Sequence, residues 1–254
     1  MRGPVRVAYE LYERGLLRDL RPEQMPKHVG VIVDGNRRWA RAFGAESPSG
    51  YRAGAGKIEE FLGWCDDLGV EVVTLWLLST DNLGRPDSEL QPLLGVIERL
   101  AGSLADVRRW RIHPVGALDL LPGTTAEQLK AAADRTSHLT AMTVNIAVGY
   151  GGRRELADAV RSLLHEHASK GTTIEELAGI LDVEHIAAHL YTRGQPDPDL
   201  VIRTSGEQRL SGFLLWHSVH SEFYFCEALW PDFRRVDFLR AIRAYAARER
   251  RFGT

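Results

Sequence analysis

Short apolar runs alternate with amphipathic segments from residue 28 to the end of the chain. Runs typical of buried strands lie at His28–Val33, Val70–Leu78, Arg111–Val115, Met142–Val148, Leu200–Arg203 and Phe223–Cys226. Helical spacing of apolar residues predicts helices at Asn36–Phe43, Gly54–Leu68, Glu89–Trp110, Thr125–His138, Arg154–Ala168, Val236–Arg250 and, as two short helices, residues 173–192. This alternation predicts one α/β domain with a mostly parallel six-stranded sheet flanked by helices.

The first 25 residues form a separate segment. Apolar positions such as Val7, Leu11 and Leu16 share a helical face, and Pro22 and Pro26 then interrupt the pattern. We therefore expect an amphipathic leader helix within residues 1–25, packed on the surface of a main domain that spans residues 26–254.

Ligands of parallel sheets bind beyond the carboxyl ends of the strands, so we expect the chemistry after Val33, Leu78, Val148 and Arg203. The first of these ends is followed by Asp34-Gly35-Asn36-Arg37-Arg38-Trp39. A glycine, a helix start and two arginines suit a phosphate group. Asp34 could hold Mg²⁺ against that phosphate, or it could simply cap the helix.

Two further strand ends carry polar loops. The second strand leads into Ser79-Thr80-Asp81-Asn82-Leu83-Gly84-Arg85-Pro86, which by itself could be an ordinary capped turn. The fifth leads into residues 203–212, where two arginines, hydroxyl groups and glycine suit a diphosphate. A plain surface loop is the weaker interpretation there, because Arg203 ends a buried run and must reach a partner.

Glu222 stands directly before three aromatic residues, Phe223, Tyr224 and Phe225. A carboxylate in such surroundings is either a buried ion-pair partner or a metal ligand, and its spacing leaves both open. His185 and His189 share a helical face but have no evident further ligand, so surface histidines are favoured over zinc ligands.

Composition narrows the function classes. The 254 residues carry a formal net charge of only −2, which argues against a general nucleic-acid binder. The two cysteines form no Cys-x-x-Cys pair, so a reducing cytoplasm is expected. No apolar signal core is evident near the N-terminus. The longest apolar stretch, Val72–Leu78, is too short to cross a bilayer, which leaves at most a peripheral membrane contact.

Residues 26–44, 78–86, 144–153 and 196–254 together resemble the cis-prenyltransferase family, the undecaprenyl diphosphate synthase group. The most specific matches are the segments His28–Ala40, Asp199–Ser211, Phe213–Trp216, Trp230–Phe233 and Glu249–Gly253. The resemblance implies a catalytic domain at 26–254, with a six-stranded sheet, a hydrophobic tunnel and a homodimeric assembly. It also implies an Mg²⁺-dependent enzyme that joins isopentenyl diphosphate to an allylic diphosphate.

The same resemblance implies roles for single residues. Asp34 would place Mg²⁺ with help from Glu222, and Asn82 would guide proton loss. The allylic diphosphate site would comprise Gly35, Asn36, Arg37, Arg38 and Trp39, with the loop Ser79, Thr80, Asp81 and Asn82, and Arg85 after it. Isopentenyl diphosphate would be held by Arg203, Arg209 and Ser211.

The chain departs from the family pattern at several positions. Ser47 and Tyr51 stand where Arg and His are usual ahead of the first long helix, Asp81 replaces Glu, and Leu83 replaces Trp. By their positions in the family pattern, these four residues are also expected to contact substrate. Asp34, Asn82, Arg203 and Arg209 remain, and this favours retained activity.

Leu77, two residues before Ser79, occupies a position that is small in long-chain members. A larger side chain there leaves less space for the growing prenyl chain, and a tightly packed interior can make more space only at an energetic cost. We therefore expect a short product of about fifteen carbons, made from geranyl diphosphate. Because side chains alternate along a strand, the sequence leaves open which face of the sheet Leu77 occupies.

Three other functions are compatible with parts of the sequence. One is a medium- or long-chain synthase of the same family. Another is a non-catalytic partner subunit, which would lose the Asp-Gly-Asn-Arg cluster that residues 34–37 keep. A nucleotide-binding enzyme is the third, but residues 50–57 only partly match a phosphate-binding loop. The favoured function is that of a cytoplasmic short-chain cis-prenyltransferase.

Overall fold

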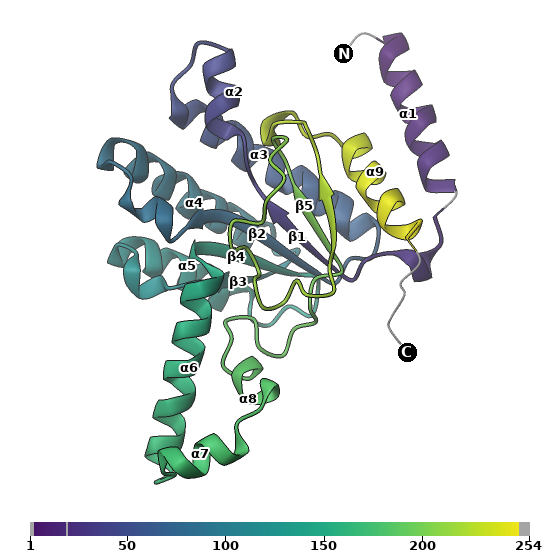
Figure 1. The fold of residues 1–254 in the computed structure, drawn as a ribbon. Coiled ribbons are helices and arrows are strands. Elements are labelled where there is room, and N and C mark those ends of the chain that lie inside the picture. Colours follow the sequence, from purple (N-terminus) through teal and green to yellow (C-terminus); the bar gives the residue numbers. More distant parts are fainter. Residues whose placement is uncertain (1–2, 19, 249–254) are drawn as a thin grey trace.

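The central element of the computed structural model, which describes residues 3–18 and 20–248, is a six-stranded sheet (Figure 1). Its strands are β1 (His28–Ile32), β2 (Val72–Ser79), β3 (Arg111–Val115), β4 (Thr143–Tyr150), β5 (Leu200–Arg203) and β6 (Glu222–Phe225). Their order across the sheet is β3-β4-β2-β1-β5-β6, and every neighbouring pair is parallel. The predicted α/β class and all six predicted strands are confirmed.

Helices connect the strands and extend the domain at both ends of the chain. They are α1 (Gly3–Arg18), α2 (Asn36–Ala42), α3 (Ser47–Asp67), α4 (Asp87–Val107), α5 (Gly123–Thr136), α6 (Gly152–Ser169), α7 (Ile174–Ile180), α8 (Val183–Ala187) and α9 (Arg235–Ala246). The long helix α6 projects away from the sheet and carries α7 at its far end (Figure 1).

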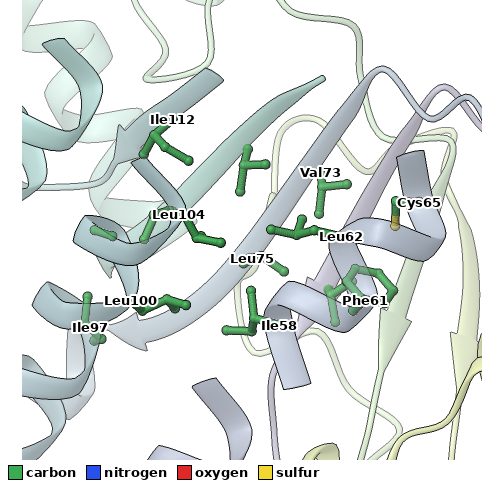
Figure 2. Packing of buried hydrophobic residues seen from close by; sticks show 14 of the residues in the cluster. Ile58, Phe61, Leu62, Cys65, Val73, Leu75, Ile97, Leu100, Leu104 and Ile112 are labelled. Carbon is green, nitrogen blue, oxygen red and sulfur yellow. The ribbon is translucent and has the colours of Figure 1, made fainter. Parts of the chain in front are cut away.

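The main core lies between one face of the sheet and the helices α3, α4, α5 and α9. Helix α3 presents Ile58, Phe61, Leu62 and Cys65, the spacing expected of one helical face, and all four are fully buried. Figure 2 shows them opposite β2, with Leu75 of that strand between the helices. Burial of this apolar face fixes α3, and with it the helix pair α2–α3, against the sheet.

The opposite face of the sheet has a smaller core. Its apolar side chains, among them Ile32, Trp76 and Tyr150, pack against Phe213 and Leu214 from the connection between β5 and β6. The Trp76 and Phe213 rings are stacked with their centroids 5.2 Å apart. The β5–β6 connection is therefore part of the folded core as well as a source of candidate site residues.

Helix α3 begins earlier than its sequence predicts, at Ser47 instead of Gly54. Proline is favoured in the first turn of a helix, and Pro48 stands there. Gly50 lies ahead of the predicted helix and Gly54 begins it, but both lie within α3, where it meets α2. Ser47 and Tyr51 are consequently residues of the helix itself.

Helix α1 packs along α9 near the C-terminal end of the described chain (Figure 1). Leu16 is buried against Val236 and Leu239. Arg234 donates a hydrogen bond to the Tyr9 hydroxyl at 2.6 Å and lies over its ring. The predicted leader helix thus lies on the surface of the main domain. No described helix is both apolar enough and long enough to span a bilayer.

Candidate active site

A pocket of about 560 Å³ opens at the carboxyl ends of β1, β2 and β5. Its lining includes Val33, Leu78 and Arg203, three of the four strand ends that the sequence singled out. The fourth, Val148, does not line it. Strand β4 continues to Tyr150, whose carbonyl oxygen accepts a hydrogen bond from the Thr80 amide at 3.0 Å.

Charged and apolar side chains share this pocket. The arginines that line it are Arg37, Arg38, Arg41, Arg85, Arg203 and Arg209, and the carboxylates are Asp34, Asp81 and Glu207. The apolar lining comes from Ile32, Val33, Trp76, Leu77, Leu78 and Leu93, with the Tyr51 ring beside them. Such a pocket suits an amphiphile with an anionic head and a hydrocarbon tail.

Asp34 follows β1 and is hydrogen-bonded on both carboxylate oxygens. Its Oδ2 accepts from Arg203 Nη2 at 2.9 Å, and its Oδ1 accepts from the Gly35 amide at 2.7 Å. Arg38 Nη2 lies 3.9 Å from Oδ2. Burial would raise the pKa of Asp34, but these hydrogen bonds outweigh it and hold the pKa below its ordinary value. Asp34 is therefore an ionised carboxylate at neutral pH.

The alternative of Asp34 as a helix cap is wrong. The N-cap of α2 is Gly35, and no side chain caps that helix. Gly35 has φ 101°, a conformation that favours glycine, and a Cβ there would lie 2.8 Å from Leu229 Cδ2. Glycine at this position allows the chain to turn from the strand into α2 directly beneath Leu229.

Arg203 connects the ends of β1 and β5. The whole residue is only 5% exposed in the folded chain. Besides Asp34, its guanidinium donates to Ser211 Oγ at 3.0 Å and to the Arg209 carbonyl oxygen. The expectation that Arg203 must reach a partner is confirmed. The same contacts link the aspartate to the loop that carries Arg209 and Ser211.

The loop after β2 is only partly in the pocket. Ser79, Asp81, Asn82 and Arg85 line it, and the Asn82 amide donates to Ser79 Oγ at 3.2 Å. Thr80 and Leu83, which were expected to contact substrate, do not line it. The Thr80 hydroxyl lies against Gly151, and Leu83 packs against the main core.

Trp39 and Ser47 also lie outside the pocket lining. The Trp39 indole donates to Asp232 Oδ1 at 2.9 Å and its ring packs on Phe43. Tyr51, by contrast, lines the pocket and its hydroxyl accepts from Arg85 at 3.4 Å. Of the two positions that differ from the family pattern ahead of Gly54, only Tyr51 is brought to the site.

Glu222 does not reach the pocket within one chain. It begins β6 and lies beside Leu200, the first residue of β5, so it is at the amino end of the sheet while Asp34 is at the carboxyl end. Its carboxylate pairs with Arg248. Of the two interpretations left open, the ion-pair partner is the one observed. Within one chain, Glu222 and Asp34 therefore lie at opposite ends of the sheet, and the metal role of Glu222 stays a prediction.

Some lining residues were not predicted. Arg41 lies one helical turn after Arg38, and Glu207 lies between Arg203 and Arg209, so a search for charges near the predicted site would have found both. Leu93 of α4 carries no such signal, because it is indistinguishable in sequence from the core leucines around it.

A metal ion in this pocket would have few protein ligands. Within residues 3–18 and 20–248, no three His, Cys, Asp or Glu side chains gather as a metal site. Mg²⁺ needs fewer protein ligands, because it is commonly bound by one or two carboxylates together with substrate phosphates and water. The ionised, half-buried Asp34 fits a metal that binds with a diphosphate.

Comparisons with known proteins agree with this geometry. The sequence model of the undecaprenyl diphosphate synthase family matches residues 32–253. The chain is 65% identical over 246 residues to a (2Z,6E)-farnesyl diphosphate synthase of Thermobifida fusca, covering 96% of each chain. It is 51% identical over 249 residues to a (2Z,6E)-farnesyl diphosphate synthase of Mycobacterium tuberculosis, covering 96% of this chain and 95% of that one.

A solved structure shares the fold. It is a lavandulyl diphosphate synthase from Lavandula x intermedia in complex with dimethylallyl diphosphate. It is 30% identical, with a TM-score of 0.85, and the match covers 91% of this chain and all of that one.

Proposed function

Because the chain belongs to the undecaprenyl diphosphate synthase family and is a prenyltransferase, we propose that its pocket joins isopentenyl diphosphate to an allylic diphosphate. The new double bond is cis. The product is a short-chain prenyl diphosphate of about fifteen carbons, which corresponds to a single addition to geranyl diphosphate. The observation that carries this proposal is the meeting of six arginines, an ionised aspartate and an apolar lining in one pocket.

The charged part of the pocket suits two diphosphate groups. Arg37 and Arg38 follow β1 and serve the allylic diphosphate, together with Arg85 from the β2 loop. Arg209 and Ser211 follow β5 and serve isopentenyl diphosphate. Bidentate guanidinium donors match the oxygen geometry of both groups.

The chemical step is ionisation of the allylic carbon–oxygen bond, which places negative charge on the leaving diphosphate. Donors fixed before the reaction stabilise this charge, and Arg38 beside Asp34 is held in that way. The alkene of isopentenyl diphosphate then attacks the allylic cation, and loss of a proton gives the new double bond. Asn82 lines the pocket and is proposed to guide this proton loss.

Asp34 would hold the divalent metal that the family uses, and we propose that the ion is Mg²⁺. When bound with the diphosphate it would neutralise part of the charge on the leaving group. Arg203 keeps the Asp34 carboxylate ionised and oriented toward the pocket through their 2.9 Å hydrogen bond.

The apolar part of the pocket supports a short product. Leu77 lines it and also packs against the main core, and Leu93 of α4 lines it as well. Longer chains would have to displace side chains that are already packed, at a cost of about 1–3 kcal/mol. A medium- or long-chain product is therefore not favoured. A non-catalytic partner subunit is disfavoured as well, because residues 34–37 line the pocket intact.

The decisive experiment incubates the purified chain with labelled isopentenyl diphosphate, Mg²⁺ and either dimethylallyl, geranyl or farnesyl diphosphate. We expect one dominant product of about fifteen carbons from geranyl diphosphate, since one addition fills the apolar lining. A ladder of products near fifty carbons would contradict the short-chain assignment. Absence of incorporation with all three primers would contradict the function itself.

Assembly and location are also proposals. We propose a homodimer in the cytoplasm, with a peripheral contact to membranes that supply or receive prenyl chains. Two unpaired cysteines, Cys65 and Cys226, support a reducing compartment. Exposed apolar side chains at Ile174, Ile180 and Leu181 support a protein contact near α7. Sedimentation equilibrium and vesicle flotation test the two contacts separately.

A further inference from the structure

A buried polar cluster lies on the second face of the sheet, outside the pocket lining. Its centre is Glu155 in the first turn of α6, which is only 1% exposed. Glu155 Oε2 accepts from the Tyr150 hydroxyl at 2.5 Å, and Oε1 accepts from the Tyr191 amide at 3.1 Å. A buried carboxylate of this kind is tolerated only where partners satisfy it.

His217 completes the cluster from another part of the chain. Its Nδ1 lies 4.0 Å from Glu155 Oε2, and its Nε2 lies 2.8 Å from the Thr192 hydroxyl. Nδ1 is buried and finds no hydrogen-bond partner among the described residues. Glu155 Oε2 is thus an acceptor close to that nitrogen, and a small rotation of either side chain would bring the two atoms within hydrogen-bond distance.

His217 belongs to the β5–β6 connection, the same segment that carries Arg209 and Ser211. A second contact ties this segment to α6, since the Gly152 amide donates to the Gly212 carbonyl oxygen at 2.9 Å. The two backbones approach so closely that a Cβ on Gly152 would lie 2.6 Å from that oxygen. The start of α6 therefore supports the connection on both sides of Phe213.

The connection needs such support because its backbone is strained. Ser211 and Leu214 have φ values of 53° and 46°, a region that costs non-glycine residues about 1 kcal/mol or more each. Strained residues persist only where surrounding contacts hold them. Burial of Phe213 and Leu214 stabilises part of this backbone, and His217 of the polar cluster follows three residues after Leu214.

We infer that Glu155 is a positioning residue which, through His217, clamps the β5–β6 connection to α6 and thereby sets the affinity for isopentenyl diphosphate. The inference rests on the proposed function, because it assigns Arg209 and Ser211 to that substrate. The allylic diphosphate site on α2 is not held by this clamp, so the two substrates respond differently when the clamp is loosened.

The first test is Glu155→Gln. Glutamine replaces one carboxylate oxygen by an NH₂ donor, which cannot accept a hydrogen bond from Tyr150 or His217, and it removes the negative charge that faces His217. We expect the KM for isopentenyl diphosphate to rise about tenfold, which is about 1.4 kcal/mol, while the KM for the primer stays within about twofold.

A pair of His217 variants tests the other half of the clamp. His217→Gln keeps a donor and an acceptor and should stay within about twofold of the wild-type KM for isopentenyl diphosphate. His217→Leu keeps the bulk but removes both polar groups, so the KM should rise about as much as in Glu155→Gln. If Glu155→Gln fails to fold, this pair decides the question alone.

Asp158→Asn is the matched control. Asp158 lies one turn further along α6 and accepts from the Tyr191 hydroxyl at 2.5 Å and from Arg154 at 2.9 Å. These two partners and Arg161, which also pairs with Asp158, lie outside the β5–β6 connection. It should lower the melting temperature and leave both KM values unchanged. An equal rise in both KM values in Glu155→Gln, or the same shift in Asp158→Asn, would show a purely structural role and overturn the inference.

Hydrogen exchange separates this inference from the proposed function. Amides of residues 209–218 should exchange faster in Glu155→Gln and His217→Leu than in Asp158→Asn, whether or not the protein turns over. A wild-type chain without prenyl transfer would contradict the proposed function, and unchanged exchange in both clamp variants would contradict the clamp.

Discussion

The crossing of α2 and α3 offers the sharpest test of how the fold positions the site, through Gly50→Ala. Helix α2 carries Arg37 and Arg38, and it rests on α3 at Gly50 and Gly54. A Cβ on Gly50 would lie 2.1 Å from the Asn36 carbonyl oxygen, whereas ordinary contacts begin at 3.4 Å. The clash is with backbone, so the start of α2 must move by about 1.3 Å, the difference between these distances.

A misplacement of this size at a reacting centre costs on the order of 10²-fold in rate. We therefore expect Gly50→Ala to lower kcat/KM for the allylic substrate about 100-fold, equivalent to about 2.7 kcal/mol of transition-state stabilisation. Isopentenyl diphosphate should be affected less, because Arg209 and Ser211 come from the β5–β6 connection and not from α2.

Two other glycines of α3 are matched controls. A Cβ on Gly56 or Gly63 would meet no atom within 4 Å. Alanine at these positions should stabilise the helix by up to about 1 kcal/mol and leave turnover unchanged. Steady-state kinetics with both substrates, together with thermal melts followed by circular dichroism, give the comparison. Wild-type kinetics in a well-folded Gly50→Ala would refute the reasoning that the α2–α3 contact sets the arginine positions.

Four further predictions concern individual side chains. Asp34→Ala, or EDTA added to the wild type, should lower turnover by about 10³-fold or more with the fold intact, and full activity in EDTA would exclude the metal role. Arg209→Ala should raise mainly the KM for isopentenyl diphosphate. Arg203→Ala should raise the same KM and also lower kcat, because it releases Asp34. If either variant raised the KM for the primer more than that for isopentenyl diphosphate, the two substrate sites would be exchanged. Leu77→Ala should lengthen the product, read by chain-length analysis, and an unchanged product would remove this residue as a determinant. Burial lowers the pKa of His28 from 6.5 in the unfolded chain to about 4 in the folded chain. The contribution of neutral His28 to the free energy of unfolding is therefore complete above pH 6.5 and falls by on the order of 3 kcal/mol as the pH decreases toward 4. In urea unfolding, His28→Gln should lose less stability than the wild type between pH 6.5 and pH 4.

Much of the fold was readable from sequence because each strand is an apolar run bounded by polar or glycine residues. The rule that ligands bind beyond the carboxyl ends of parallel strands also predicts a site at Asp34, Asn82 and Arg203. The start of α3 was missed for a physical reason. Residues 50–57 partly match a phosphate-binding loop in sequence, and only the helix crossing shows why Gly50 is needed within the helix.

Glu222 illustrates a limit of the strand-end rule within one chain. The predicted strand began at Phe223, so a residue before it should lie at the amino end of a parallel sheet, away from the other candidates. The register of β5 with β6, in which Glu222 lies beside Leu200, agrees with the rule. The assignment of Glu222 to the metal comes from the family resemblance alone.

The facing of Leu77 could not be read from sequence because it depends on an irregularity of the backbone. Trp76 pairs with Ala147 and Leu78 with Val148, so the ladder between β2 and β4 shifts register at Leu77. In a regular strand Trp76 and Leu78 would face the same side. Instead Trp76 belongs to the second core, whereas Leu78 belongs to the main core and Leu77 packs against it. The shift therefore brings two consecutive leucines to the α3–α4 side of the sheet at the pocket, and the apolar space there depends on this backbone feature as well as on the size of residue 77.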